Sequence, residues 1–419
     1  MLEKIWGALF VLTIMLPIGN SQYPFFDALI NKYGVTILDV MDTLDVAACV
    51  LLRMSKRNIK CRVKIGNLWR ISLVCLAISL FFMSLWKGYQ VYGVKAIRDA
   101  FNYVVCIEFL LLSILLKHSK LTYGKILELA EIGFIGYTIN TVLTTTFIVG
   151  FGSRVSGNSF SLAIMLVPFE VYKYLKNYGS KLKNYGSKNR IFAVLLCFMI
   201  NTVLSQDRAI IALTGLGSIF VALDFLKGRV TRKQLYKLLG ISAAACIFIV
   251  VLAVSKASVL IRIITGGEID TFTGRLFTFK YYYDAMKKNI WGYGFGYVMH
   301  FFTAGNYMLP KETYQIDNAF VVYGVKGGFL FSIVCTALAM IPMLDSIGNK
   351  TMEYKMFRIS YLFLLVSAYL FTSQIIQGRA TAMLIWTLVG MSIKNYKEGI
   401  FGLNELRKTK FETTYRQQL

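Results

Sequence analysis

Apolar runs long enough to cross a membrane recur along the whole chain, and this feature limits what the chain can fold into. A transmembrane helix needs about 20 mainly apolar residues. Hydrophobic residues make up 56% of this sequence and charged residues only 16%, whereas a soluble domain carries about 25% charged residues. The sequence therefore predicts an all-α polytopic integral membrane protein. Its twelve predicted spans are 5–20, 34–52, 68–86, 100–116, 126–148, 158–172, 191–205, 209–226, 238–254, 319–343, 357–374 and 380–393.

The basic residues predict how these spans are oriented. The chain has 46 Lys and Arg against 22 Asp and Glu, which gives a net charge of +24. In a soluble protein this charge would suggest nucleic acid as a partner, but in a membrane protein Lys and Arg gather in the cytoplasmic loops. With the N-terminus inside, every second inter-span segment carries most of the basic residues. We therefore expect a multi-pass protein with both termini in the cytoplasm and no nucleic-acid partner.

The same alternation places one long segment, residues 255–317, outside the cell. Loops longer than about 15 residues are usually functional or disordered, and this one is rich in aromatic residues and glycine. Apolar residues recur with helical spacing over 274–289, which predicts a helix along the membrane surface. GYGFG at 292–296 predicts a turn whose backbone closely approaches a ligand. The chain then divides into nine spans (1–254), the long outer loop (255–317), three spans (318–393) and a basic cytoplasmic tail (394–419).

Arginine is the notable residue type on the predicted outer side. A guanidinium group binds phosphate oxygens in a bidentate manner better than lysine does, and a charge near the membrane must be paired or face water. Together these arginines suit a shared anionic ligand such as a lipid-linked diphosphate. For any one of them, a salt bridge or an interaction with lipid headgroups is the alternative. They are Arg98, Arg154, Arg208, Arg262, Arg275 and Arg379.

Asp317 and Asn318 stand at the entrance to the tenth predicted span. A carboxylate in this place can accept a proton from a sugar hydroxyl, and an asparagine can orient that hydroxyl. An aspartate there can equally cap the N-terminus of the helix that follows, so both interpretations stay open. The outer loop has no group of carboxylates or histidines with metal-ligand spacing. We therefore expect neither a metal nor another cofactor.

Several short motifs together resemble the O-antigen ligase/Wzy polymerase superfamily. They are TGR at 273–275 with the aromatic stretch after it, GYGFG, Asp317-Asn318 before a glycine-bearing span, GFGSRVSGNSFSLA at 150–163 and SQDRAIIAL at 205–213. The resemblance implies a GT-C-like, metal-independent glycosyltransferase in the inner membrane of a bacterium. Its reaction would move a growing glycan from undecaprenyl diphosphate onto a sugar hydroxyl of another undecaprenyl-diphosphate-linked repeat unit, at the periplasmic face. Membrane lipids and a polysaccharide chain-length regulator are further partners that it implies.

The resemblance also implies roles for individual residues. Asp317 would be the general base and Arg275 a catalytic contact to the diphosphate. The predicted substrate-binding residues are Arg154, Arg208, Arg98, Arg379 and Asn318. Ligases of this superfamily typically have His-Asn where this chain has Asp317-Asn318, and this difference favours an O-antigen polymerase. The alternatives are a ligase that transfers finished glycan to the lipid A core and a flippase for lipid-linked oligosaccharides.

Overall fold

The structure is a computed structural model that describes the helical parts of the chain and a hairpin. The described residues are 2–15, 43–44, 47, 68–101, 103, 123–149, 158–179, 188–205, 207–226, 270–302, 308–313, 316–347, 352–371 and 379–394. The predicted spans 34–52, 100–116 and 238–254 lie wholly or largely outside these residues, as does the predicted tail.

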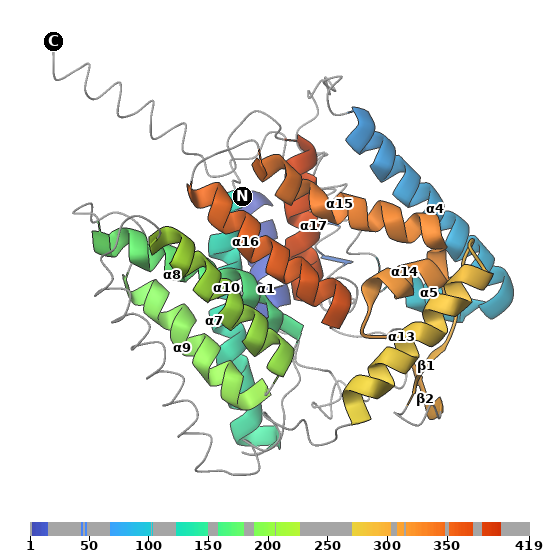
Figure 1. The fold of residues 1–419 in the computed structure, drawn as a ribbon, viewed down its shortest axis with the longest axis horizontal. Coiled ribbons are helices and arrows are strands. Elements are labelled where there is room, and N and C mark those ends of the chain that lie inside the picture. Colours follow the sequence, from blue (N-terminus) through green and yellow to red (C-terminus); the bar gives the residue numbers. More distant parts are fainter. Residues whose placement is uncertain are drawn as a thin grey trace.

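Helices account for almost all of the described structure (Figure 1). The helices before residue 230 are α1 (Leu2–Met15), α4 (Leu68–Tyr92), α5 (Val94–Phe101), α7 (Tyr123–Thr144), α8 (Ala163–Gly179), α9 (Lys188–Ser205) and α10 (Arg208–Leu226). The π-helical turn η4 (Thr145–Val149) extends α7, and the 3₁₀ turn η5 (Asn158–Leu162) precedes α8. The later elements are α13 (Asp270–Lys288), β1 (Met299–Phe302), β2 (Met308–Thr313), α14 (Ala319–Gly327), α15 (Phe329–Ile347), α16 (Met352–Val366), η6 (Ser367–Phe371) and α17 (Arg379–Lys394).

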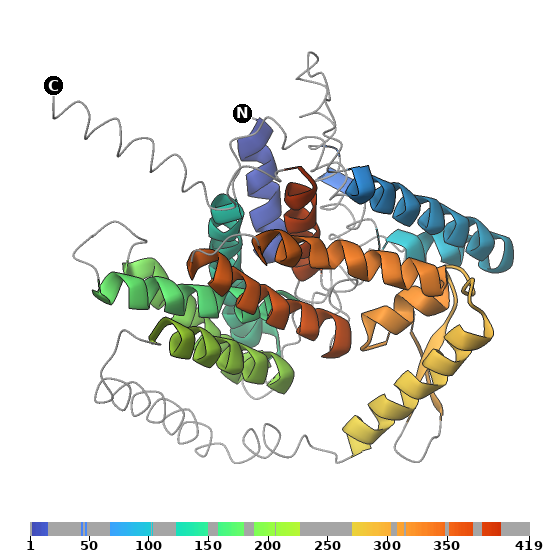
Figure 2. The same ribbon diagram turned by 45° about the horizontal axis from the view of Figure 1, so that its top comes forward.

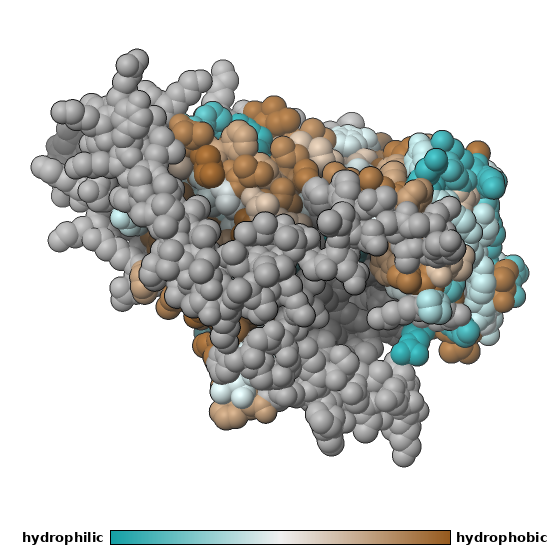
Figure 3. Space-filling view, turned by 60° about the horizontal axis from the view of Figure 1, so that its bottom comes forward, coloured by the Kyte–Doolittle hydropathy of each residue, from teal (hydrophilic) through white to brown (hydrophobic). Residues whose placement is uncertain are grey.

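Hydropathy and surface both indicate that the described helices belong in a membrane. Three of them are long and apolar enough to cross one: Leu68–Tyr92, Tyr123–Phe147 and Phe329–Ile347. Four shorter apolar helices accompany them in the described part of the chain. Large apolar side chains such as Trp86, Phe147 and Phe192 point outward, which a water-soluble surface would not tolerate in such number. Figure 3 shows this apolar surface and, at the end of the molecule that holds α13 and the hairpin, more hydrophilic residues.

The helices pack into two groups joined by α15 and α17. In one group α8 packs against α10, α9 and α16, while α1 packs along α7. In the other, α4 contacts α5 and α15, and α13 lies beside α14 (Figure 2). Helix α15 also contacts α16 and α17, so the core is continuous from Trp6 to Ile393. In lipid such contacts depend on close packing and polar links more than on the hydrophobic effect.

Ion pairs and hydrogen bonds tie helix ends together. The Arg70 guanidinium, at the start of α4, pairs with Asp345 near the end of α15 and donates to the carbonyl of Ser392 in α17 at 2.8 Å. The ammonium group of Lys173 in α8 donates to Glu131 in α7 at 2.7 Å. The paired ends are ends that the charge alternation assigns to the same face of the membrane.

Two features differ from the sequence prediction. The span predicted at 319–343 is broken, because Gly328 has a φ of +92° and separates α14 from α15. The region between the membrane helices is also not entirely helical. Strands β1 and β2 form an antiparallel hairpin in which His300 pairs with Glu312. The helix predicted at 274–289 is present as α13.

The GYGFG turn brings its backbone against other helices. Gly292, Gly294 and Gly296 all have positive φ, and a Cβ on Gly294 would lie 2.6 Å from the backbone nitrogen of Gly88 in α4. A Cβ on Gly292 would lie 2.5 Å from the carbonyl oxygen of Lys326 in α14. In the described structure the close approach that these glycines allow is to α4 and α14, and an approach to a ligand stays a prediction.

This packing predicts the effect of an alanine at Gly294. Gly294→Ala should destabilise the fold by about 1–2 kcal/mol, because alanine disfavours the left-handed backbone conformation. Overpacking of its Cβ against α4 should destabilise the fold by about 1–3 kcal/mol more. Gly93→Ala is the matched control, because Gly93 also has positive φ but no atom within 4 Å of its added Cβ. We expect Gly294→Ala to lower the melting temperature in detergent clearly more than Gly93→Ala does. Equal shifts would contradict the close packing of the turn on α4.

Candidate functional site

The structure joins two of the predicted site residues directly. Arg275 lies in the second turn of α13, and Asp317 lies just before α14. The Nε atom of Arg275 is 3.0 Å from Oδ2 of Asp317, with the two side chains 57% and 33% exposed. The pair is therefore open to a ligand. The two terminal nitrogens of Arg275 have no partner among the described residues, so a planar fork of donors stays free beside the carboxylate.

Asn318 settles which residue caps the helix. Its Oδ1 accepts a hydrogen bond from the backbone N–H of Val321 at 3.1 Å, and its backbone is extended, as an N-cap requires. Asp317 is consequently not the cap of α14. Its carboxylate faces Arg275 instead, and the following helix N-terminus adds a favourable field for negative charge near it.

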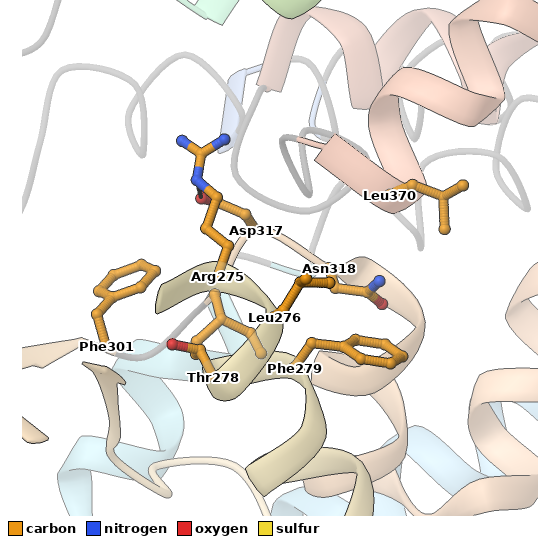
Figure 4. Close-up of a pocket in the computed structure, with 9 residues that line it drawn as sticks. Arg275, Leu276, Thr278, Phe279, Phe301, Asp317, Asn318 and Leu370 are labelled. Atoms are coloured by element: carbon orange, nitrogen blue, oxygen red, sulfur yellow. Dashed lines mark ion pairs between the residues drawn. The ribbon is translucent and has the colours of Figure 1, made fainter. Parts of the chain in front are cut away.

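A cavity of about 330 Å³ opens beside this pair (Figure 4). Helix α13 contributes one wall, β1 and the residues before α14 contribute others, and Leu370 of η6 closes the far side. Only four of the lining side chains are polar, and two of these form the ion pair. The site is thus an apolar cavity with a charged edge, a design that fixes the orientation of an amphiphilic ligand. It is lined by Arg275, Leu276, Thr278, Phe279, Phe301, Ile316, Asp317, Asn318 and Leu370.

The wall formed by α13 is fixed to the hairpin. The Thr278 hydroxyl donates to the carbonyl of Gly274 at 2.8 Å and accepts the N–H of Phe302 at 2.9 Å. The N–H of His300 donates to the Tyr282 hydroxyl at 2.6 Å. These bonds hold β1 along α13, so the turn that carries Arg275 has a rigid support.

Three influences act on the Asp317 carboxyl. Burial raises its pKa, the Arg275 guanidinium lowers it, and the negative charge of Asp207 raises it further, with a net rise from the usual value of 3.8. Asp207 immediately precedes α10, where its Oδ1 accepts from the N–H of Ile210 at 3.4 Å. Asp207, which belongs to the SQDR motif, is therefore close enough to the site to act on Asp317. The sequence prediction did not include Asp207, although it adjoins the predicted site residue Arg208.

Among the other arginines predicted for the site, Arg98 is the one whose side chain lies in the described part of the structure. Arg98 is exposed on α5 and does not line the cavity. Arg208 and Arg379 begin α10 and α17, and their side chains are outside the described structure, as is all of Arg154. In the part of the chain that the structure describes, no group of three or more His, Cys, Asp or Glu side chains could hold a metal ion.

One comparison with known proteins finds a match. Residues 192–335 match the model of the O-antigen ligase family (Wzy_C), a stretch that includes α10, α13, the hairpin, α14 and both members of the Arg275–Asp317 pair. Members of that family are glycosyltransferase-like membrane ligases and polymerases of surface polysaccharide synthesis. No curated protein and no solved structure matches the chain.

The charges around Asp317 predict opposite effects of two substitutions. Arg275→Gln removes the positive charge that lowers the pKa of Asp317, so we expect this pKa to rise. Asp207→Asn removes a repelling negative charge, so the pKa should fall. A pH titration of the Asp317 carboxyl band by infrared difference spectroscopy, with Asp317→Asn as the reference, measures both. Asp284→Asn, on the exposed part of α13, is a control that leaves the pKa unchanged. Shifts in the same direction would refute this arrangement.

Proposed function

We propose that this chain, a membrane protein with an O-antigen ligase domain of the Wzy_C family over residues 192–335, polymerises the lipid-linked repeat units of a bacterial surface polysaccharide. The donor is a glycan on undecaprenyl diphosphate, and the acceptor is a sugar hydroxyl of a second lipid-linked unit. The reaction takes place at the outer face of the inner membrane.

The observation that carries this proposal is the Arg275–Asp317 pair at the edge of an apolar cavity. A lipid-linked diphosphate has one apolar and one anionic end, and this site offers apolar walls beside free guanidinium donors. Arg275 uses its Nε for Asp317, so both terminal nitrogens can bind phosphate oxygens as a fork. Asp317 then lies next to the bond that must break.

The residues divide the chemistry between them. Asp317 accepts the proton of the acceptor hydroxyl, whose oxygen forms a bond to the anomeric carbon of the donor sugar. The bond from that carbon to the diphosphate breaks, and undecaprenyl diphosphate leaves with the electron pair. Arg275 stabilises the charge that develops on the departing diphosphate. Arg154, Arg208, Arg98 and Arg379 are proposed as further contacts to diphosphate or glycan, and Asn318 orients the acceptor while it caps α14.

The raised pKa of Asp317 suits a general base. A carboxylate of ordinary acidity is a weak proton acceptor, and a base becomes more effective as its pKa approaches the working pH. Asp207 and burial move the pKa of Asp317 in this direction. Arg275 limits the rise, which keeps the carboxylate ionised and able to accept a proton.

A ligase is the second candidate, because the matching family model is described as O-antigen ligase. A ligase would use the same donor but transfer the finished glycan to the lipid A core. The aspartate at position 317, where the ligases of the resemblance have histidine, supports the polymerase. A chain-length regulator is proposed as a partner of the polymerase only.

Deleting the gene in its bacterial host separates these candidates. We expect surface glycan one repeat unit long, since ligation continues without polymerisation. Complementation with the wild-type gene restores the full ladder of lengths. Naked core with long lipid-linked chains accumulating inside would identify a ligase. Repeat units confined to the cytoplasmic leaflet would identify a flippase.

Substitutions in the pair test the division of roles. In a reconstituted assay with repeat units on the outer side, we expect Asp317→Asn to lower kcat by about 10²–10⁴-fold, the usual contribution of a general base. Arg275→Ala should lose about 10²–10³-fold. Arg275→Lys should retain more activity than Arg275→Ala, because it keeps the charge but loses the fork. Wild-type turnover by Asp317→Asn would remove this residue from the base role.

A further inference from the structure

A second ion pair lies in the interior, away from the cavity. The Lys326 ammonium group, near the end of α14, donates to Oδ1 of Asp99 in α5 at 2.6 Å, and both side chains are fully buried. The Tyr103 ring lies 5.7 Å from the ammonium nitrogen and adds a cation–π contact. Charged residues buried in membrane helices are costly and are therefore usually functional.

The carboxylate of Asp99 does more than neutralise the lysine. Its Oδ2 accepts the N–H of Gly296, the last glycine of the GYGFG turn, at 2.7 Å. The backbone carbonyl of Lys326 accepts two further hydrogen bonds at 2.9 Å, from the Ser84 hydroxyl of α4 and from the N–H of Gly294. The pair therefore fastens α4, α5, the GYGFG turn and α14 at one point.

Helix α14 is the element that most needs this support. It has only nine residues, and a helix this short is marginally stable alone. Asp317 and Asn318 precede its first turn, while Lys326 lies in its last. At 1.5 Å per residue, the lysine is about 12 Å along the axis from Asn318. Because a helix is stiff over this length, its C-terminal anchor also sets where its N-terminal end lies.

We propose that Asp99 and Lys326 are positioning residues, which hold α14 so that Asp317 and Asn318 stand at the cavity beside Arg275. The role in turnover rests on the proposed function, whereas the mechanical coupling does not. Neither residue touches the cavity. Their contribution to the reaction acts through the placement of the carboxylate.

The test compares single and double variants of the purified full chain. Lys326→Met leaves the buried Asp99 carboxylate without its opposite charge, and Asp99→Asn leaves the buried Lys326 ammonium group without its opposite charge; each should lower the melting temperature strongly. The double variant Asp99→Asn/Lys326→Met removes both charges, and the asparagine can still accept the Gly296 N–H. We expect it to regain most of the lost melting temperature. A double variant less stable than either single variant would overturn the pairing.

The folded double variant then tests positioning. We expect its kcat to be at least tenfold lower than that of the wild type, with KM for the lipid-linked donor nearly unchanged, because the cavity remains but the carboxylate is less well placed. Asp345→Asn is the matched control. It breaks the buried Arg70–Asp345 pair at the other end of α15, and we expect lower stability with kcat unchanged per folded molecule. Wild-type kcat in the double variant, or an equal loss in Asp345→Asn, would overturn the positioning role.

A readout without turnover separates this inference from the proposed function. The pKa of Asp317, measured by infrared titration, depends on the distance between its carboxylate and Arg275. We therefore expect this pKa to shift in the folded double variant and to stay unchanged in Asp345→Asn. If wild-type protein makes no polymer but this pKa shifts, the proposed function fails and the coupling stands. An unchanged pKa in the double variant would overturn the coupling.

Discussion

The pairing of buried charge governs the half of the molecule that holds the site. Asp99 and Lys326 lie 227 residues apart in the sequence and meet in an interior from which water is excluded. In such surroundings a charge without a partner is far more costly than in water. Separating Asp99 from Lys326 is therefore strongly unfavourable. The bond therefore fixes where α5 crosses α14, and the glycines of the GYGFG turn let the backbone pass between them.

The ion pair between Arg275 and Asp317 is subject to the same electrostatics, with the opposite consequence. Arg275 and Asp317 are partly exposed, so their attraction is screened and contributes little stability. We propose that the pair takes part in the reaction. Its guanidinium terminal nitrogens, which have no partner among the described residues, and a carboxylate of raised pKa share the edge of one apolar cavity. The buried pair, which we propose to position α14, and the open pair, which we propose to take part in the reaction, thus lie at the two ends of α14.

Hydropathy predicted most helices well, because a membrane helix must be apolar over a fixed length. The predicted spans 191–205 and 209–226 lie within a few residues of α9 and α10. The break at Gly328 escaped prediction, since an apolar run continues through it and only the backbone conformation reveals it. The hairpin escaped prediction because its two strands are only four and six residues long and lie within the long outer loop.

Residue types predicted part of the site, and the fold supplied the rest. Arginine and aspartate on the predicted outer side suggested phosphate binding and proton transfer, and Arg275 and Asp317 do meet. Which arginine meets the aspartate depends on how α13 lies against α14, which no local pattern encodes. The Asp99–Lys326 pair went unnoticed for the same reason, because its members are 227 residues apart in the sequence, whereas Asp207 adjoins Arg208 and could have been singled out.

The most direct test of the account is an experimental structure of the protein with undecaprenyl diphosphate bound, the product that leaves in the proposed reaction. We predict that the diphosphate lies within hydrogen-bonding distance of the terminal nitrogens of Arg275, with the first isoprene units against Leu276 and Phe279. A diphosphate bound elsewhere, with the Arg275–Asp317 edge empty, would contradict it.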